Sequence, residues 1–221
     1  MKSVSTRTVE NQVEEGIAIL KKGGIVAYPT DTVYGLGASM TNIAAVERIF
    51  DVKGRPKGMA LPLLVANREQ IKQIAKIIPP AAWLLIYNFL PGALTIVLNK
   101  SDSVLDIITG GGKTIAIRIP DHPIPLALIK GLGQPIVGTS ANLSGQPSPL
   151  TAEEVRMQIG DKVDMIIDGG QCPGGVESTV VDLSNSKPLV RRLGAITLKQ
   201  LRQTVPDIQL AKEIKNASRN R

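Results

Sequence analysis

VDMIIDGGQCPGGVESTVVDLSNSKPLVRR, residues 163–192, indicates which kind of β-sheet the chain forms. It contains three runs of mostly β-branched and other apolar residues, at 163–168, 178–183 and 188–192, and the segments between them are rich in the turn formers Gly, Pro, Ser and Asn. No helical pattern separates the runs. Because a parallel connection needs a long crossover, which is usually a helix, three successive strands without one exclude a purely parallel sheet. The sheet is therefore predicted to be mixed.

The rest of the chain alternates helical and extended patterns, which is typical of an α/β protein. Apolar residues recur at helical spacing over 9–20, before Gly23 and Gly24, and over 43–50, after Asn42. A further helix is predicted at about 80–90, capping-box spacing occurs at Asn67/Gln70, Thr151/Glu154 and Thr197/Gln200, and strands are predicted at 25–28, 61–65, 94–99, 114–119 and 135–139.

These elements predict a single-domain α/β fold with a twisted mixed parallel/antiparallel sheet flanked by helices. We expect the catalytic domain to span residues 1–205. Residues 206–221 are polar and basic towards the end, so they are predicted to be a flexible tail.

Composition favours an anionic ligand. The 221 residues include 26 Lys and Arg against 19 Asp and Glu, a formal net charge of +7, and such a surface attracts nucleotides or nucleic acid. Aromatic residues make up only 3% of the chain, which argues against a stacking platform for single-stranded nucleic acid. The basic residues are therefore expected to bind phosphate.

Cysteine and histidine each occur once. The single Cys172 excludes an internal disulfide and a multi-cysteine metal site, and it fits a reducing compartment. The neighbours of Cys172 and of His122 match no recognised ligand spacing, so both are predicted to be structural. The first seven residues lack the apolar core of a signal peptide, and the apolar stretch 81–98 is interrupted by Asn88 and a Pro-Gly pair. We expect a cytoplasmic protein with no membrane span.

Two glycine motifs resemble nucleotide-binding motifs and fail. Gly110-Gly111-Gly112-Lys113-Thr114 looks like the end of a P-loop, but Ile107 occupies the position of its first glycine, and 114–119 alternates as a strand where a P-loop leads into a helix. Gly35-Leu36-Gly37 lacks the third glycine of a dinucleotide fingerprint, because that position is Met40.

Polar and basic residues gather instead in five loops or strand ends, at 28–37, 53–58, 138–145, 174–179 and 191–194, and Arg118 adds a cation on the strand 114–119. In the second loop, Lys53, Arg55 and Lys57 alternate with Gly and Pro, so we expect them to project from a fixed loop and hold polyphosphate. Each segment alone is compatible with an ordinary turn or a solvated charge run. Together they predict a ligand site beyond the strand ends.

Six ordered motifs give the sequence a resemblance to the YrdC-type threonylcarbamoyl-AMP synthases over roughly residues 10–200: Pro-Thr-Asp-Thr-Val-Tyr-Gly-Leu, Lys-Gly-Arg-Pro, Leu-Pro-Gly, Ile-Arg-Ile-Pro-Asp-His-Pro, Ser-Ala-Asn-Leu-Ser-Gly and Val-Glu-Ser-Thr. The resemblance implies a YrdC-like fold with a positively charged concave cleft. It also implies a nucleotidyltransferase, L-threonylcarbamoyladenylate synthase, which condenses L-threonine, bicarbonate or CO₂, and ATP with Mg²⁺ into threonylcarbamoyl-AMP and pyrophosphate. A separate threonylcarbamoyl transferase would then modify the adenosine beside the tRNA anticodon, so contact with tRNA itself would be indirect.

The resemblance also implies residue roles. Threonine-contacting positions match Thr32, Arg118, Ser140 and Ser178, and nucleotide positions match Lys53, Arg55, Thr114, Asn142 and Arg192. The chain departs from the family pattern in a segment after Arg55 that is two residues longer, in Ala66 where many relatives have a polar residue that faces threonine, and in Leu193 where proline is frequent. The extra C-terminal domain of longer members is expected to be absent.

The residue inventory suits this chemistry independently of the resemblance. A threonine carbamate and ATP are both anionic, so fixed cations lower the repulsion between them. Lys53 and Arg55 are the predicted catalytic residues, which with Lys57 and Mg²⁺ would neutralise the leaving pyrophosphate, and no protein ligand for the metal is predicted. Two alternatives stay open: an RNA-binding module of this fold without turnover, and a paralogue that acts on another carbamoyl or carboxylate substrate.

Overall fold

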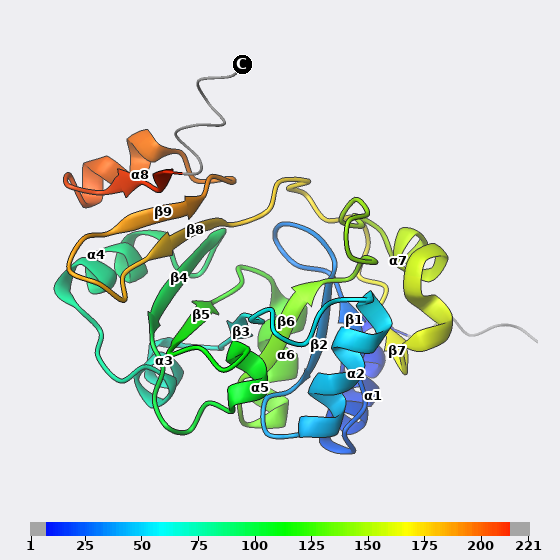
Figure 1. Cartoon of the computed structure of the whole chain (residues 1–221). Coiled ribbons are helices and arrows are strands. Elements are labelled where there is room, and N and C mark those ends of the chain that lie inside the picture. The colour runs from blue at the N-terminus through cyan, green and yellow to red at the C-terminus, as the bar shows by residue number, and fades with distance from the viewer. Residues whose placement is uncertain (1–7, 213–221) are drawn as a thin grey trace, which may run out of the picture.

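A computed structural model describes residues 8–212 (Figure 1). Its ten strands form one sheet in the order β10-β9-β8-β4-β5-β3-β6-β2-β1-β7. The strands are β1 (Val26–Tyr28), β2 (Gly35–Ser39), β3 (Leu63–Leu64), β4 (Leu94–Asn99), β5 (Thr114–Arg118), β6 (Ile136–Ser140), β7 (Met165–Ile166), β8 (Thr179–Asp182), β9 (Leu189–Arg192) and β10 (Gln209–Leu210). The helices are α1 (Val9–Lys21), α2 (Ile43–Lys53), α3 (Arg68–Ile74), α4 (Pro80–Phe89), α5 (Asp106–Thr109), α6 (Pro123–Leu132), α7 (Ala152–Ile159) and α8 (Leu198–Thr204), with a 3₁₀ turn at Gly160–Lys162.

The sheet is mixed, as residues 163–192 predict. β8 and β9 pair antiparallel, whereas β8 runs parallel to β4 and β7 runs parallel to β1. β7 is not a neighbour of β8 and β9, however. β7 lies at one edge of the sheet and β8 lies near the other, so the chain between them crosses the molecule (Figure 1). This crossing brings residues 174–178 to the ends of the central strands.

Most predicted helix starts carry the expected caps. Asn42 caps α2 by accepting from Ala45 N at 2.9 Å, and Gly23 takes a positive φ of 82° just after α1. Only Thr197/Gln200 forms the complete capping box. At Asn67/Gln70 and Thr151/Glu154 the cap side chain accepts from the backbone amide three residues on, as in a capping box. The Gln70 and Glu154 side chains, however, accept from the backbone amide of the residue before the cap and not from that of the cap itself.

Alternating side chains divide the sheet into a packed face and a face that carries the site. Ile115 and Ile117 of β5 join the larger core cluster with helices α2, α3, α4 and α8. Ala116 and Arg118, which point to the opposite face, line a cavity. Over β1, β3 and β6 that second face is covered by α1 and α6, whose buried Leu20, Leu128 and Ile129 form a smaller cluster. The cavity therefore lies beside this smaller cluster.

Gly35 and Gly37 of β2 have a packing role. The ring of Tyr28 on the neighbouring strand lies so close that a Cβ on either glycine would stand 2.9 Å or 2.8 Å from it. Tyr28 is fully buried, which raises the pKa of its hydroxyl. The Gly35-Leu36-Gly37 run thus reflects close approach of an aromatic ring to the backbone.

The packed domain extends beyond the predicted boundary at residue 205. β10 pairs in parallel with β9, and Ile208 and Ala211 are buried, because these two apolar side chains complete the core next to α8. The predicted tail at 206–221 is therefore wrong for residues 206–211, and residues 213–221 lie outside the described residues. Within the described range, no helix is both long and apolar enough to cross a membrane.

Candidate functional site

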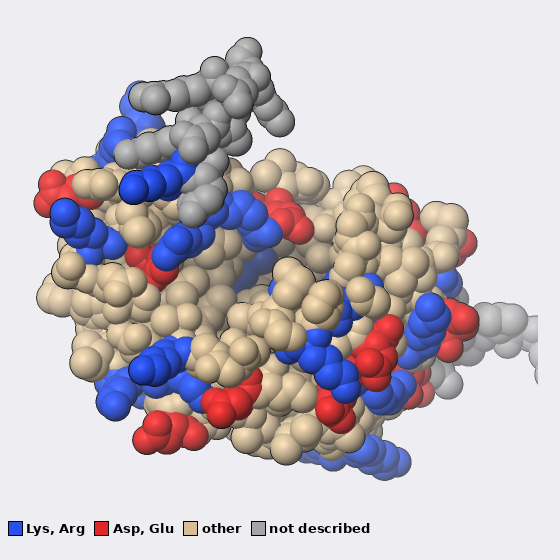
Figure 2. Space-filling model, viewed as in Figure 1, with Lys and Arg blue, Asp and Glu red and all other residues tan. Residues whose placement is uncertain are grey.

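A cavity of about 350 Å³ opens where the ends of the central strands meet the crossing segment. The space-filling view shows a hollowed face with Lys and Arg atoms along its wall and rim (Figure 2). The volume lies within the ~300–1,000 Å³ range of small-molecule sites. The lining residues are Thr30, Thr32, Val33, Tyr34, Gly35, Arg55, Pro62, Leu64, Thr95, Ala116, Arg118, Gly138, Thr139, Ser140, Glu177, Ser178, Val180, Arg191 and Arg192.

Arg118, at the end of β5, is held on three sides. Its Nε donates to Gly92 O at 3.0 Å, Nη1 donates to Thr32 Oγ1 at 3.0 Å and Nη2 donates to Asp31 Oδ1 at 2.7 Å. Asp31 Oδ1 also accepts from Asp121 N at 3.1 Å. The Arg118 and Asp31 side chains are only 10% and 15% exposed, so solvent screens this ion pair little. Thr32 and Arg118 therefore form one fixed unit in the wall of the cavity.

Ser178, just before β8, also lines the cavity and contacts residues of two strands, Thr95 of β4 and Arg192 of β9. Its Oγ lies 2.8 Å from Thr95 Oγ1, and Arg192 Nη2 donates to Ser178 O at 3.0 Å and Oγ at 3.3 Å. Arg192 is also ion-paired with Glu177, and both side chains are nearly half exposed. Because screening by solvent makes such a pair weak, an anionic ligand can displace Glu177 from Arg192.

Lys53 lies in the interior of the protein and not on the projecting loop where the sequence placed it, and its role towards the nucleotide stays a prediction. It is the last residue of α2, is 3% exposed, and donates from Nζ to Ser140 O, to Asn142 O at 2.7 Å and to Asn142 Oδ1 at 3.1 Å. Asn142 is equally occupied, since its Oδ1 also accepts from Ser140 Oγ and its Nδ2 donates to Leu143 O and Gln146 O. Neither side chain lines the cavity. Together they hold the turn that presents Ser140.

Burial, together with the nearby charge of Arg55, lowers the pKa of Lys53 to about 8, and Glu177 opposes this shift with a smaller effect. The lysine is thus an interior group whose ammonium is easily titrated. The prediction that it projects from a loop is wrong, because α2 continues through Lys53 and turns its side chain towards the end of β6.

Of the three cations predicted to hold phosphate, only Arg55 lines the cavity. Its Nη2 donates to Ala60 O at 2.8 Å, its Nε is buried without a partner, and burial lowers its pKa. A buried donor without a partner is costly, so Arg55 is suited to an anionic ligand. Lys57 instead forms an exposed ion pair with Glu47 at 3.2 Å.

Thr114 stands at the beginning of β5, on the same face as Ala116 and Arg118 but two residues farther from the cavity than Ala116. It pairs with Asn99 of β4. The structure thus brings together Thr32, Arg55, Arg118, Ser140, Ser178 and Arg192 in one lining, and leaves Lys53, Thr114 and Asn142 outside it.

Several site residues escape the sequence prediction. Asp31, which orients Arg118, directly precedes Thr32 in the same sequence motif, so it could have been chosen as a site residue. Glu177 and Arg191 are likewise next to predicted site residues. Thr95 had no signal, because it lies inside an apolar strand. Tyr34 donates to Gly170 O at 2.8 Å, and burial raises its pKa to about 12, so its hydroxyl stays protonated.

Cys172 and His122 are placed as structural residues. Cys172 is a free, buried thiol whose backbone amide donates to Leu150 O at 2.8 Å. His122 caps α6 by accepting from Ile124 N at Nδ1, and burial lowers its pKa. Across residues 8–212, no group of three or more His, Cys, Asp or Glu residues is arranged to hold a metal ion.

The fold and the lining define an α/β protein with a small-ligand site made of hydroxyl groups and four arginines, Arg55, Arg118, Arg191 and Arg192, against one glutamate. Such a site suits a ligand that is polar and anionic. The positive potential of the cleft as a whole stays a prediction.

Comparison with known proteins identifies the family. The model of the Sua5/YciO/YrdC family, described as "Telomere recombination", matches residues 18–194, so the chain belongs to this family. It is 42% identical to the threonylcarbamoyl-AMP synthase of Pyrococcus abyssi over 94% of this chain and 61% of that protein, and 41% identical to the synthase of Bacillus subtilis over 93% and 60%. A solved structure of P. abyssi Sua5 complexed with L-threonine superposes with a TM-score of 0.90 at 41% identity, and covers 94% of this chain and 61% of that one. The chain spans about three fifths of the length of these relatives.

Proposed function

We propose that the chain is an ATP-dependent L-threonylcarbamoyladenylate synthase. The observation that carries the proposal is one cavity in which the hydroxyls of Thr32, Ser140 and Ser178 share the lining with Arg55 and Arg192. Hydroxyl groups suit a small amino acid, and arginines suit the phosphates of a nucleotide. The similarity to a Sua5 structure with L-threonine supports the assignment of the amino acid.

The reaction would proceed in two steps. The threonine amine takes up CO₂ from bicarbonate and loses a proton to form a carbamate. The carbamate oxygen then attacks the α-phosphorus of ATP, and the bond to pyrophosphate breaks. Both reactants are anions, so the principal work of the protein is to hold them in line and to compensate their charges.

We assign a proposed role in these steps to each of several residues of the site. Arg118 is already fixed by Asp31 and Thr32, so it offers a preoriented cation to the threonine carboxylate. Arg55 and Arg192, whose charges are only partly neutralised within the protein, would face the phosphates. Lys53 and Asn142 lie outside the cavity and hydrogen-bond to Ser140, so they would affect catalysis by holding Ser140 in place.

Mg²⁺ is proposed to enter with ATP. Glu177 is the one carboxylate in the lining, and it is engaged by Arg192. Magnesium sites of this kind rely on substrate phosphates with one or two carboxylates, so the donors present fit a metal carried mainly by the nucleotide. The ion would neutralise phosphate charge.

The product implies a downstream threonylcarbamoyl transferase that acts on the adenosine beside the tRNA anticodon, in the cytoplasm. An RNA-binding module without turnover would show strongly salt-dependent affinity for RNA and no ATP consumption. A paralogue with another substrate would release pyrophosphate with a different amino acid.

The test is pyrophosphate release from ATP and bicarbonate with each of the twenty amino acids in turn, with products identified by mass spectrometry. We expect L-threonine to give the highest kcat/KM, with L-serine as the nearest competitor because it lacks only the methyl group. Turnover that prefers an unrelated amino acid would reject the threonine assignment, and no turnover with any of them would reject the enzyme.

A further inference from the structure

The run Gly110-Gly111-Gly112 has no part in the site described above. Gly110 is the left-handed cap of α5 with φ 60° and ψ 31°, and Gly111 follows with φ 80°. The amides of Gly111 and Gly112 donate to Asp106 O at 2.9 Å and Thr109 O at 3.0 Å. They are therefore used inside the turn, unlike the amides of a P-loop, which face a phosphate.

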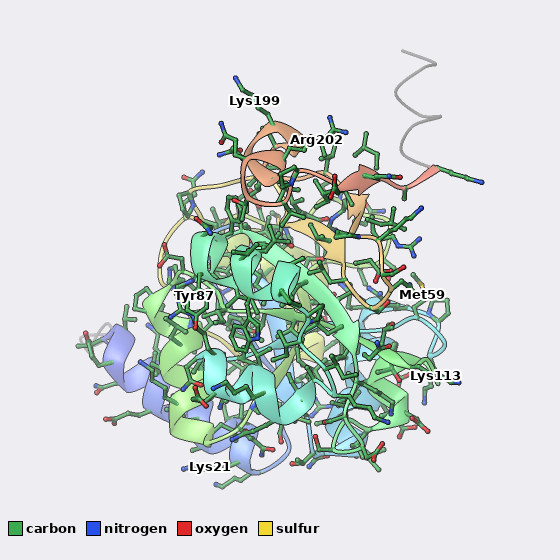
Figure 3. The ribbon with its side chains drawn as sticks, turned by 90° about the vertical axis from the view of Figure 1, so that its left-hand side faces the viewer. Lys21, Met59, Tyr87, Lys113, Lys199 and Arg202 are labelled. Atoms are coloured by element: carbon green, nitrogen blue, oxygen red, sulfur yellow. The ribbon has the colours of Figure 1, made fainter. Side chains whose placement is uncertain are left out.

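The backbone of this turn lies directly against the loop that follows α2. A Cβ on Gly110 would stand 2.3 Å from Gly58 O and 2.8 Å from Gly58 C, which no relaxed structure tolerates. Beside this contact, Leu61 N donates to Ile108 O at 2.7 Å. Met59, which follows Gly58, and Lys113, three residues after Gly110, lie at the same side of the molecule (Figure 3).

The loop that rests on this turn carries Arg55. The Arg55 guanidinium is tied to the same loop, through the bond from Nη2 to Ala60 O. A shift of the loop backbone therefore moves the guanidinium within the cavity.

We propose that Gly110 is a positioning residue for the nucleotide: it lets the turn after α5 approach Gly58 and so sets the place of Arg55 in the cavity. The proposal rests on the proposed function in taking ATP as the ligand. The glycine run that resembles a phosphate loop would then serve phosphate indirectly, as the support of the arginine loop.

Gly110→Ala and Gly111→Ala form a matched pair for the test. Both glycines have positive φ, so both substitutions strain the backbone, but a Cβ on Gly111 meets nothing within 4 Å. We expect Gly110→Ala to raise the apparent KM for ATP by at least about tenfold, because displacements near 1 Å can be that costly, and to change the KM for threonine less than about twofold. Gly111→Ala should change neither constant.

Trypsin provides a readout that needs no turnover. Cleavage after Lys57 should be several-fold faster in Gly110→Ala than in Gly111→Ala, because the displaced loop has lost its support. Calorimetric titration with ATP should show weaker binding for Gly110→Ala alone. Equal trypsin rates together with equal ATP affinities in the two variants would overturn the proposal. A wild-type protein that binds ATP but lacks threonine-dependent turnover would reject the proposed function and leave this comparison intact.

The wild-type protein gives a third test if Gly110→Ala does not fold. On addition of ATP, hydrogen exchange should slow both in a peptide that covers 55–61 and in one that covers 108–112. Protection of 55–61 without any change at 108–112 would show that the two segments are not coupled and would overturn the proposal.

Discussion

Replacement of Lys53 by methionine should destabilise the protein strongly, although the side chain carries one of the charges that the sequence assigns to phosphate. Methionine retains a long unbranched apolar side chain but loses the ammonium, which donates to Ser140 O and to Asn142 O and Oδ1. Asn142 Oδ1 keeps its bond from Ser140 Oγ, so two carbonyl oxygens lose this donor. At about 1–3 kcal/mol for each buried polar group left unpaired, and after allowing for relief of the buried charge, we expect a loss of about 2–4 kcal/mol.

Urea unfolding at pH 7 measures this loss directly. With an m-value of about 2 kcal/mol/M, the midpoint should fall by about 1–2 M. Lys57→Met is the matched control: its ion pair with Glu47 is half exposed, so we expect a change within about 0.5 kcal/mol. If Lys53 instead faced the phosphates, Lys53→Met would weaken ATP binding and leave stability unchanged. Equal midpoints for the two variants would show that the Lys53 ammonium does not stabilise the folded protein.

Three further predictions follow from the site. Arg55→Ala should abolish adenylate formation and leave the circular-dichroism spectrum unchanged, because the guanidinium makes a single hydrogen bond within its own loop; threonine- and bicarbonate-dependent pyrophosphate release at the normal rate would contradict this. Arg118→Ala should raise the KM for threonine with little change in ATP affinity. It should also lower stability by about 1–3 kcal/mol, because the charge of Asp31 then stays shielded from solvent without its partner. A titration in which ATP affinity falls and threonine affinity does not would reassign Arg118. Lys53 should make the free energy of unfolding rise with pH from about 8 towards 10.5. In that window the folded state has released the Lys53 proton, whereas the unfolded chain still binds it. A wild-type protein whose stability changes over that window in parallel with that of Lys53→Met would disprove this contribution of Lys53.

Local patterns were sufficient to predict most of the fold. The β-branched and apolar runs at 178–183 and 188–192 predict β8 and β9, and the lack of a helix between them predicts the mixed sheet in which they pair antiparallel. The partner of β7 could not be predicted, because a two-residue strand at the sheet edge is selected by contacts with β1, far away in the sequence. β10 was not predicted either, because two buried side chains in a polar segment give no periodic pattern.

The site shows a similar division. The resemblance to the YrdC-type family selects Thr32, Arg118, Ser140 and Ser178, which the fold does bring to one cavity. The direction of Lys53 was not predictable from its charge, because one further helical turn decides whether the ammonium faces solvent or the interior. Asp31 shows the converse, since its role depends on an arginine 87 positions away.

If this cavity joins threonine, one carbon of bicarbonate and AMP, a mass spectrum of the nucleotide products formed from ATP, L-threonine and ¹³C-bicarbonate shows it. We expect an adenylate that contains threonine and one labelled carbon, formed together with pyrophosphate. An adenylate without the label, or pyrophosphate release that does not depend on threonine, would contradict it.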